Sequence, residues 1–339
     1  MQPFSYQRAD SIADAVRLGR DTGAGDVHAS TEFLAGGTTL VDLMRLEVMT
    51  PSHLVDLNPL RQQHAQISVD DQGLDLGAFV SMAQAARHPQ VNARYPVIAE
   101  SLKLAASQQL RNMATLGGNL LQRTRCPYFR DISWQSCNKR APGSGCAAMA
   151  GVNRNHAVLG VDDSCIAQYA GDFAVALIAL DAQLTLQGPD GTRRVALAGL
   201  HRDPGGQPHL ENNLAPGELI TGIHVPAGAW TARSTYVKVR DRESYEFAIA
   251  SAAVALHLDG DIVRTARLGL GGMAYRPWRS QAAEQLLQGR KLTRDVMEQA
   301  AHQALEGAVT HGHNDYKPEL ARRTVVRALQ AAQSLQPRA

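Results

Sequence analysis

The four cysteines of this chain are the residues whose type and spacing most clearly indicate chemistry. They are Cys126, Cys137, Cys146 and Cys165, so 10, 8 and 18 residues separate successive members of the set. Four thiolates can hold an iron–sulfur cluster or a zinc ion, and four thiols can pair as disulfides in three ways. Zinc sites commonly use closely spaced CxxC pairs, which are missing here, so the spacing argues against zinc.

The segment that carries these cysteines, residues 122–168, is rich in glycine and in positive charge. Three groups of residues stand out: Gly143, Gly145, Gly151 and Pro142, which favour a loop; the basic Arg123, Arg125, Arg130, Lys139, Arg140 and Arg154; and the acidic Asp131, Asp162 and Asp163. A basic loop of this kind can wrap an iron–sulfur cluster, because four thiolates make the cluster anionic. The residues alone leave open a cluster, a structural zinc site, and buried thiols or disulfides.

Two Gly-Gly turns are the second feature with chemical potential. The first glycine turn, residues 35–40, joins an apolar strand at 33–35 to a helix at 40–48, and the second glycine turn spans residues 114–119. Backbone N–H groups in such turns form anion pockets suited to a pyrophosphate, and two turns could hold a dinucleotide from opposite sides. Neither turn matches GxGxxG or a P-loop, so ordinary strand-to-helix turns are the alternative.

The elements that must position these residues form three successive units. Residues 1–60 alternate helix and strand, which favours a small α/β unit with a parallel strand pair. The predicted elements beyond it are helices at 78–87, 97–107 and 171–182, a hairpin over 183–197 and a surface loop over 200–216; then strands at 234–240, 249–258, 262–264 and 266–271, and helices at 280–288, 294–307 and 318–333. Strands followed by helices predict a C-terminal α+β unit whose sheet is covered on one face by helices.

Composition excludes several classes of protein. The chain has 339 residues, 44% of them hydrophobic and 19% charged, and a formal net charge of +2 without a polybasic run, so we expect no nucleic-acid partner. No stretch approaches the roughly 18 apolar residues that a membrane span needs. The N-terminal residues lack the pattern of a signal peptide, so we expect a cytoplasmic protein or one exported with a partner that carries the signal.

The chain resembles the FAD-binding subunits of molybdenum hydroxylases, the xanthine dehydrogenase family, over residues 34–58, 109–131, 238–256 and 269–279. The similarity is greatest to the FAD subunit of periplasmic aldehyde oxidoreductases and extends to that of 4-hydroxybenzoyl-CoA reductase. Most relatives lack the cysteine insertion, and in those that have it four cysteines hold a [4Fe–4S] cluster. The resemblance therefore implies that Cys126, Cys137, Cys146 and Cys165 are cluster ligands.

The same resemblance implies the fold and its division. It predicts an α+β protein with a two-subdomain FAD-binding domain of the vanillyl-alcohol oxidase/PCMH type over residues 1–226, divided into 1–60 and 61–226, with the iron–sulfur loop at 122–168. A smaller C-terminal α+β domain of the CO-dehydrogenase-flavoprotein type, with a three-stranded sheet covered by helices, would occupy residues 227–339.

Individual FAD contacts also follow from the resemblance. The implied set is Glu32, Phe33, Leu34, Ala35, Gly36, Gly37, Thr38, Thr39, Leu40, Thr115, Gly118, Asn119, Asp172, Ile220 and Lys238. Asp172 would contact the adenosine end, although it could equally be a helix N-cap. Lys238 would lie near the flavin ring, although a solvent-facing position on an alternating strand explains it as well. The family often has Ser where Gly171 stands, which removes a hydroxyl contact.

The resemblance implies an electron-transfer role for the chain. It would carry FAD and a [4Fe–4S] cluster, and would pass electrons from a [2Fe–2S] small subunit and a molybdenum-cofactor large subunit to an external acceptor. A twin-arginine signal on a partner subunit would direct the export of the assembly. The resemblance implies no acid or base catalyst on this chain, because the redox chemistry belongs to the cofactor. Alternatives are the FAD subunit of a xanthine dehydrogenase-like or hydroxybenzoyl-CoA reductase-like enzyme, a stand-alone flavin reductase, and a non-enzymatic scaffold with a zinc or disulfide loop.

We predict that the FAD is held without a covalent bond. The two glycine turns supply a binding site, and no Cys or His stands in the family's covalent-attachment context. Acid precipitation of the purified protein should therefore release all of the yellow flavin into the supernatant. Flavin absorbance that stays with the precipitated protein would contradict the prediction.

Overall fold

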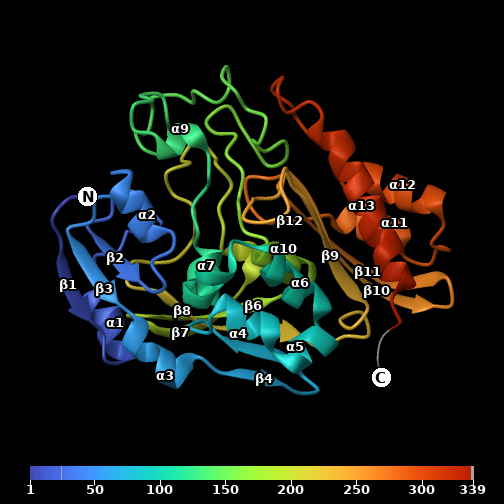
Figure 1. The fold of residues 1–339 in the computed structure, drawn as a ribbon, viewed down its shortest axis with the longest axis horizontal. Helices are drawn as coiled ribbons and strands as arrows, with labels where there is room; N and C mark the ends of the chain where they lie inside the picture. Colours follow the sequence, from blue (N-terminus) through green and yellow to red (C-terminus); the bar gives the residue numbers. More distant parts are fainter. Residues whose placement is uncertain (24, 337–339) are drawn as a thin grey trace.

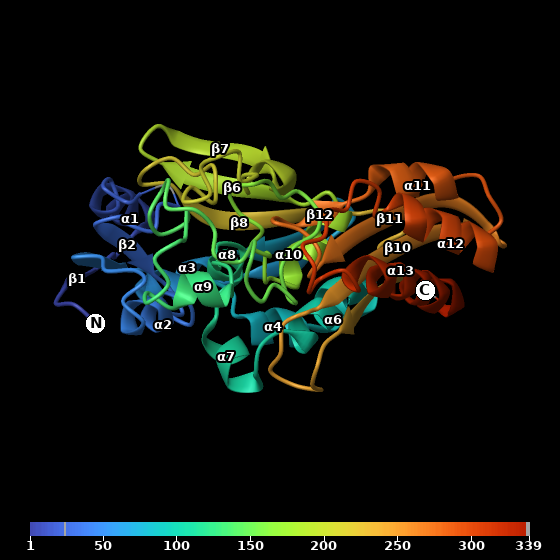
Figure 2. The same ribbon diagram turned by 90° about the horizontal axis from the view of Figure 1, so that it is seen from above.

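The chain folds into three sheets that follow one another along an elongated molecule. The structure is a computed structural model that describes residues 1–23 and 25–336; residue 24 and residues 337–339, the last of the predicted C-terminal domain, lie outside the described residues. Figure 1 shows the N-terminal unit in blue and the C-terminal helices in red at opposite ends, and Figure 2 shows the same order from above. The predicted α+β class is confirmed.

The strands form sheets of three, five and four members, ordered β1-β3-β2, β4-β5-β8-β6-β7 and β12-β11-β10-β9. Their bounds are β1 Ser5–Arg8, β2 Thr31–Leu34, β3 His53–Asp56, β4 Ile67–Val69, β5 Gly73–Gly77, β6 Gln183–Gly188, β7 Gly191–Ala196, β8 Leu219–Pro226, β9 Ser234–Val239, β10 Ala250–Asp259, β11 Ile262–Gly271 and β12 Trp278–Arg279. The predicted hairpin over 183–197 is confirmed as the β6–β7 pair.

The helices cover these sheets and connect them. Their bounds are α1 Ile12–Leu18, α2 Leu40–Arg45, α3 Arg61–His64, α4 Met82–Arg87, α5 Pro89–Arg94, α6 Pro96–Leu104, α7 Gln108–Met113, α8 Leu116–Leu120, α9 Pro127–Arg130, α10 Phe173–Ala179, α11 Gln281–Leu287, α12 Arg294–Gln303 and α13 Lys317–Ser334, with 3₁₀ turns at Asn58–Leu60 and Leu197–Gly199. No helix within the described part of the chain has the length and apolar character that a membrane crossing requires.

The N-terminal sheet confirms the predicted parallel arrangement. β3 pairs in parallel with β1 on one side and with β2 on the other, and α2 connects β2 to β3. The sequence did not indicate β1, because all four of its residues are exposed and no apolar alternation marks it. Parallel pairing places the C-terminal ends of these strands on one edge, where the first glycine turn follows β2.

The C-terminal sheet differs from the prediction in three respects. It has four strands and not three, because the short strand β12 pairs with β11. The predicted strands at 262–264 and 266–271 are a single strand, β11, because Thr265 between them pairs with His257 of β10 and the pairing continues beyond a register shift between His257 and Leu258. The sheet is also covered on both faces. Alternate residues of β10 enter different cores: Ala253 and Ala255 join the central core, whereas Val254 and Leu256 pack with α11, α12 and α13.

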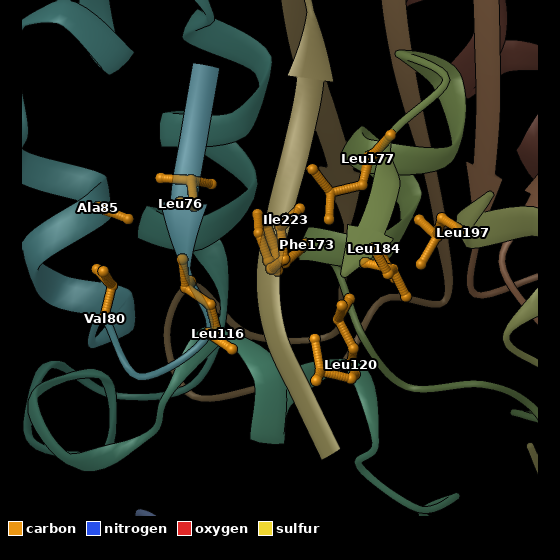
Figure 3. Packing of buried hydrophobic residues seen from close by; sticks show 14 of the residues in the cluster. Leu76, Val80, Ala85, Leu116, Leu120, Phe173, Leu177, Leu184, Leu197 and Ile223 are labelled. Atoms are coloured by element: carbon orange, nitrogen blue, oxygen red, sulfur yellow. The ribbon is translucent and has the colours of Figure 1, made fainter. Parts of the chain in front are cut away.

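Helix α10 lies at the centre of the molecule, and all seven of its residues are buried. It packs against α6 and β11, and Leu177 points into the apolar cluster shown in Figure 3 together with Leu184 and Leu197. Asp172 directly precedes the helix, so its position depends on this packing.

We predict that Leu177→Ala destabilises the protein by about 2–5 kcal/mol, because it leaves a cavity in a core that cannot collapse around it. Thermal and denaturant unfolding of the purified protein would measure the change. Leu46→Ala is the matched control, because Leu46 is 37% exposed. An equal loss of stability in both variants would contradict the central role of α10.

Candidate functional site

One cavity of about 800 Å³ collects most of the predicted cofactor contacts. Its volume is at the upper end of the range for small-molecule sites. Of the fifteen residues predicted to contact FAD, thirteen line this cavity: Glu32, Phe33, Ala35, Gly36, Gly37, Thr38, Thr39, Leu40, Thr115, Gly118, Asn119, Asp172 and Ile220. Leu34 and Lys238 do not line it. The fold thus brings together residues from the N-terminal sheet, the middle unit and the start of α10.

The first glycine turn presents a set of free backbone donors to the cavity. Within residues 1–23 and 25–336, the amides of Gly36, Gly37, Thr38 and Thr39 have no hydrogen-bond partner. Gly37 has φ +70°, a conformation that glycine adopts without strain. Successive unpaired N–H groups of this kind form a concave anion site, which fits a pyrophosphate.

The second glycine turn does not offer the free backbone N–H groups that the sequence predicted. Its amides are already bonded inside the protein: Gly117 N–H donates to the Ala78 carbonyl at 2.9 Å, and Gly118 N–H donates to Thr115 Oγ1 at 3.2 Å. The turn therefore offers side chains. Asn119 Oδ1 is buried and has no partner among the described residues, so it is an acceptor available to a ligand in the cavity.

The two glycine turns are in direct contact. A Cβ atom at Gly36 would lie 2.3 Å from the carbonyl oxygen of Met113 and 2.9 Å from Cα of Ala114, at the start of the second turn. Only glycine permits this approach. Gly36 is therefore needed to bring the two turns together around the cavity.

Asp172 and Lys238 form a buried ion pair beside the cavity. Lys238 Nζ donates to Asp172 Oδ2 at 2.7 Å and to the Leu104 carbonyl at 3.0 Å, and Tyr236 OH donates to Asp172 Oδ1 at 2.7 Å. The Lys238 side chain is only 1% exposed, so the solvent-facing alternative is wrong. Lys238 acts on the cavity by fixing the Asp172 carboxylate. The side chain of Asp172 makes no N-cap hydrogen bond.

The sequence did not single out several residues that line the cavity. Arg123 and Glu211 form a buried ion pair at 3.0 Å, although Glu211 belongs to the predicted surface loop at 200–216. Burial raises the pKa of Glu32 to about 7, and the Arg123 guanidinium opposes the rise. His156 also lines the cavity, and burial together with the charge of Lys317 lowers its pKa to about 4. Arg123, Glu211 and His156 are distant from one another in the sequence, and only the positive charge of Arg123 was a signal. Glu32 was already among the predicted FAD contacts.

The four cysteines come together at one side of this cavity, and all four are free thiols, so the disulfide alternative is not found. Cys126 lines the cavity and packs against apolar clusters that contain Cys137 and Cys165, while Cys137 and Cys146 form a β-bridge. A hydrogen bond with Cys165 lowers the pKa of Cys146 to about 6 and raises that of Cys165, and burial raises that of Cys126 to about 12.

The thiols do not form a compact ready-made metal site. Among the described residues, no three His, Cys, Asp or Glu side chains are close enough together to hold a single ion. A cluster of four irons needs four thiolates spread around its faces, which is compatible with four free thiols meeting from one loop. Four thiols from one segment are a donor set that both a [4Fe–4S] cluster and a four-cysteine zinc site use.

Comparison with protein families decides the class of this chain. Residues 2–228 match the family described as the FAD binding domain in molybdopterin dehydrogenase, and residues 234–332 match the CO dehydrogenase flavoprotein C-terminal domain. The chain belongs to the FAD-binding subunits of molybdenum hydroxylases. It is therefore an oxidoreductase subunit with an FAD-binding domain.

Individual relatives agree with this assignment. The chain is 44% identical over 337 residues to the aldehyde oxidoreductase FAD-binding subunit PaoB of Escherichia coli K12, covering 98% of this chain and 99% of that one. It is 27% identical to the carbon monoxide dehydrogenase medium chain of Hydrogenophaga pseudoflava, over 97% of this chain and 96% of that one. A solved carbon monoxide dehydrogenase from the same organism superposes with a TM-score of 0.74 at 27% identity, covering 98% and 97% of the two chains.

We predict that Gly36→Ala weakens FAD binding about tenfold, because the added methyl group overlaps the Met113 carbonyl and forces the two glycine turns apart. Flavin released from the purified protein, measured per chain across a dilution series, would report the loss. Gly199→Ala is the matched control, since nothing lies within 4 Å of a Cβ there. Equal flavin content in both variants would show that the contact between the turns is not required.

Proposed function

We propose that this chain is the FAD- and [4Fe–4S]-carrying electron-transfer subunit of a molybdenum-containing aldehyde oxidoreductase. Electrons would arrive from a [2Fe–2S] small subunit and a molybdenum-cofactor large subunit, and leave to an external acceptor. Bound FAD would supply the redox chemistry that links one-electron donors to that acceptor. The chain's own residues would bind and orient the flavin and the cluster.

The observation that carries this proposal is that Cys126 belongs both to the cysteine set and to the wall of the FAD cavity. A cluster held by Cys126 would therefore lie against the flavin site. The relative with 44% identity is named as an aldehyde oxidoreductase FAD-binding subunit, which favours an aldehyde over carbon monoxide or a purine as the substrate class of the assembly.

The proposed residue roles follow the geometry of the cavity. The free amides of Gly36, Gly37, Thr38 and Thr39 would bind the pyrophosphate, and Asn119 Oδ1 would accept a hydrogen bond from the ligand. Asp172, fixed by Lys238 and Tyr236, would accept hydroxyl or amine donors of the adenosine end. Ile220, which is 5% exposed, would give an apolar surface for the flavin.

Charge around the cysteine set supports a cluster over the scaffold alternative. Arg125 and Arg130 share the Asp42 carboxylate at 3.3 and 2.7 Å, which leaves a net positive charge on that side of the segment. A hydrogen bond with Cys146 and burial raise the pKa of Cys165, and the charge of buried Lys139 opposes that rise. The proposal includes export of the folded assembly by a twin-arginine signal on a partner subunit.

We predict that Cys137→Ser lowers iron and acid-labile sulfide in the purified assembly by about four of each per chain, because a [4Fe–4S] cluster needs four thiolates. Ala141→Ser is the control, since Ala141 is exposed in the same loop. Elemental analysis before and after the substitution would measure the change. One zinc per chain in the unmodified protein, or unchanged iron in Cys137→Ser, would overturn the cluster assignment and favour the scaffold alternative.

A further inference from the structure

His156 is a buried histidine, and among the described residues the only side-chain hydrogen bond of its imidazole is to a cysteine. Its Nε2 lies 3.2 Å from Sγ of Cys126, and the residue is 3% exposed. The other ring nitrogen, Nδ1, has no hydrogen-bond partner within the described part of the chain. The imidazole and Cys126 both line the FAD cavity. Within residues 1–23 and 25–336 no other side-chain hydrogen bond orients this ring, and the Asn153 backbone beside it opposes the fall in its pKa.

The direction of this hydrogen bond follows from the state of the sulfur. A cysteine bound to a cluster is a thiolate, which carries no proton and can only accept. The imidazole must then be the tautomer with hydrogen on Nε2, donating to Sγ. Nδ1 is then the acceptor nitrogen of the ring, and it has no hydrogen-bond partner among the described residues.

The backbone of His156 is held in place from the C-terminal domain. Lys317, fully buried at the start of α13, donates to the His156 carbonyl at 2.9 Å, to Gln168 Oε1 at 2.8 Å and to the Gly272 carbonyl at 2.6 Å. Tyr128 packs its ring beside the imidazole at a centroid distance of 6.0 Å. The imidazole thus has little freedom to turn away from Cys126.

We infer that His156 is a positioning residue of the cysteine cluster, which donates a hydrogen bond from Nε2 to the Cys126 sulfur and thereby raises the reduction potential of that cluster. The reason is electrostatic: a reduced cluster carries one more negative charge, so it gains more from the donor than the oxidised cluster does. This inference rests on the proposed [4Fe–4S] function. According to this inference, the residue that sets the cluster potential lies in the wall of the cavity proposed to hold the flavin.

The test is a redox titration of the purified assembly, with the cluster followed by electron paramagnetic resonance and the flavin by absorbance. His156→Leu removes the donor, and we expect the ratio of reduced to oxidised cluster at a fixed potential to fall about tenfold, a negative shift of about 59 mV for one electron. His156→Gln keeps an N–H donor and should restore much of the potential. The flavin midpoint should stay unchanged.

His201→Leu is the matched control. His201 is a half-buried histidine, and its Nε2 faces the carbonyl oxygen of Leu120 at 2.9 Å rather than a sulfur. The cluster potential should be the same as in the unmodified protein. An equal negative shift in His201→Leu and His156→Leu would overturn the inference, because the effect would then follow from the loss of any imidazole.

Iron content separates the remaining outcomes. An iron content in His156→Leu equal to that of the unmodified assembly, with an unchanged potential, would overturn the inference and leave the proposed function standing. An unmodified assembly whose iron is accounted for by the [2Fe–2S] small subunit alone would overturn the proposed function, and the inference with it. If His156→Leu and His156→Phe both lose iron while His156→Gln keeps it, the donor itself holds the cluster, which supports the inference. Loss of iron in all three variants would assign His156 a packing role only.

Discussion

A buried chain of charges, Arg123–Glu211–Lys139, holds the cysteine segment to the rest of the molecule. Glu211 accepts from Arg123 at 3.0 Å and from Lys139 at 2.6 Å, and Lys139 also bonds Tyr275 at 2.7 Å. Burial would raise the pKa of Glu211, but the two cations lower it, so the carboxylate is charged. Removing one partner from such a network leaves an uncompensated charge in the interior, which is why its members stabilise the fold only together.

The anchoring matters because residues 122–168 contain little regular structure of their own. Apart from α9, the segment relies on contacts with neighbours: Arg130 reaches Asp42 on α2, Asn153 reaches the His311 carbonyl, and Lys317 reaches the His156 carbonyl. These contacts come from the N-terminal unit and from the C-terminal domain. The segment therefore connects parts of the chain whose sheets do not pair with one another, and it closes one side of the FAD cavity.

The cavity combines two different kinds of binding group. The first glycine turn offers unpaired backbone amides, which suit the charged pyrophosphate. The second turn offers side chains, because its backbone amides are already hydrogen-bonded within the protein. Close approach of the turns at Gly36 links both kinds in one site. With His156 and Cys126 on the same wall, the residues proposed to bind the flavin adjoin those proposed to set the potential of a cluster.

The sequence by itself determined the two glycine turns, the gathering of all four cysteines in one basic segment, the parallel N-terminal unit and the family. These are local features, since turn residues, apolar periodicity and short motifs depend on neighbouring positions. Only the tertiary structure showed that Lys238 forms an ion pair with Asp172 and that Glu211, from a predicted surface loop, forms an ion pair with Arg123. It also showed that β10 is buried on both faces. It also brought His156 to Cys126, 30 positions away. Each of these contacts forms because packing buries side chains that are far apart in the sequence in the same region, away from water. A local sequence pattern does not show which side chains will be buried together.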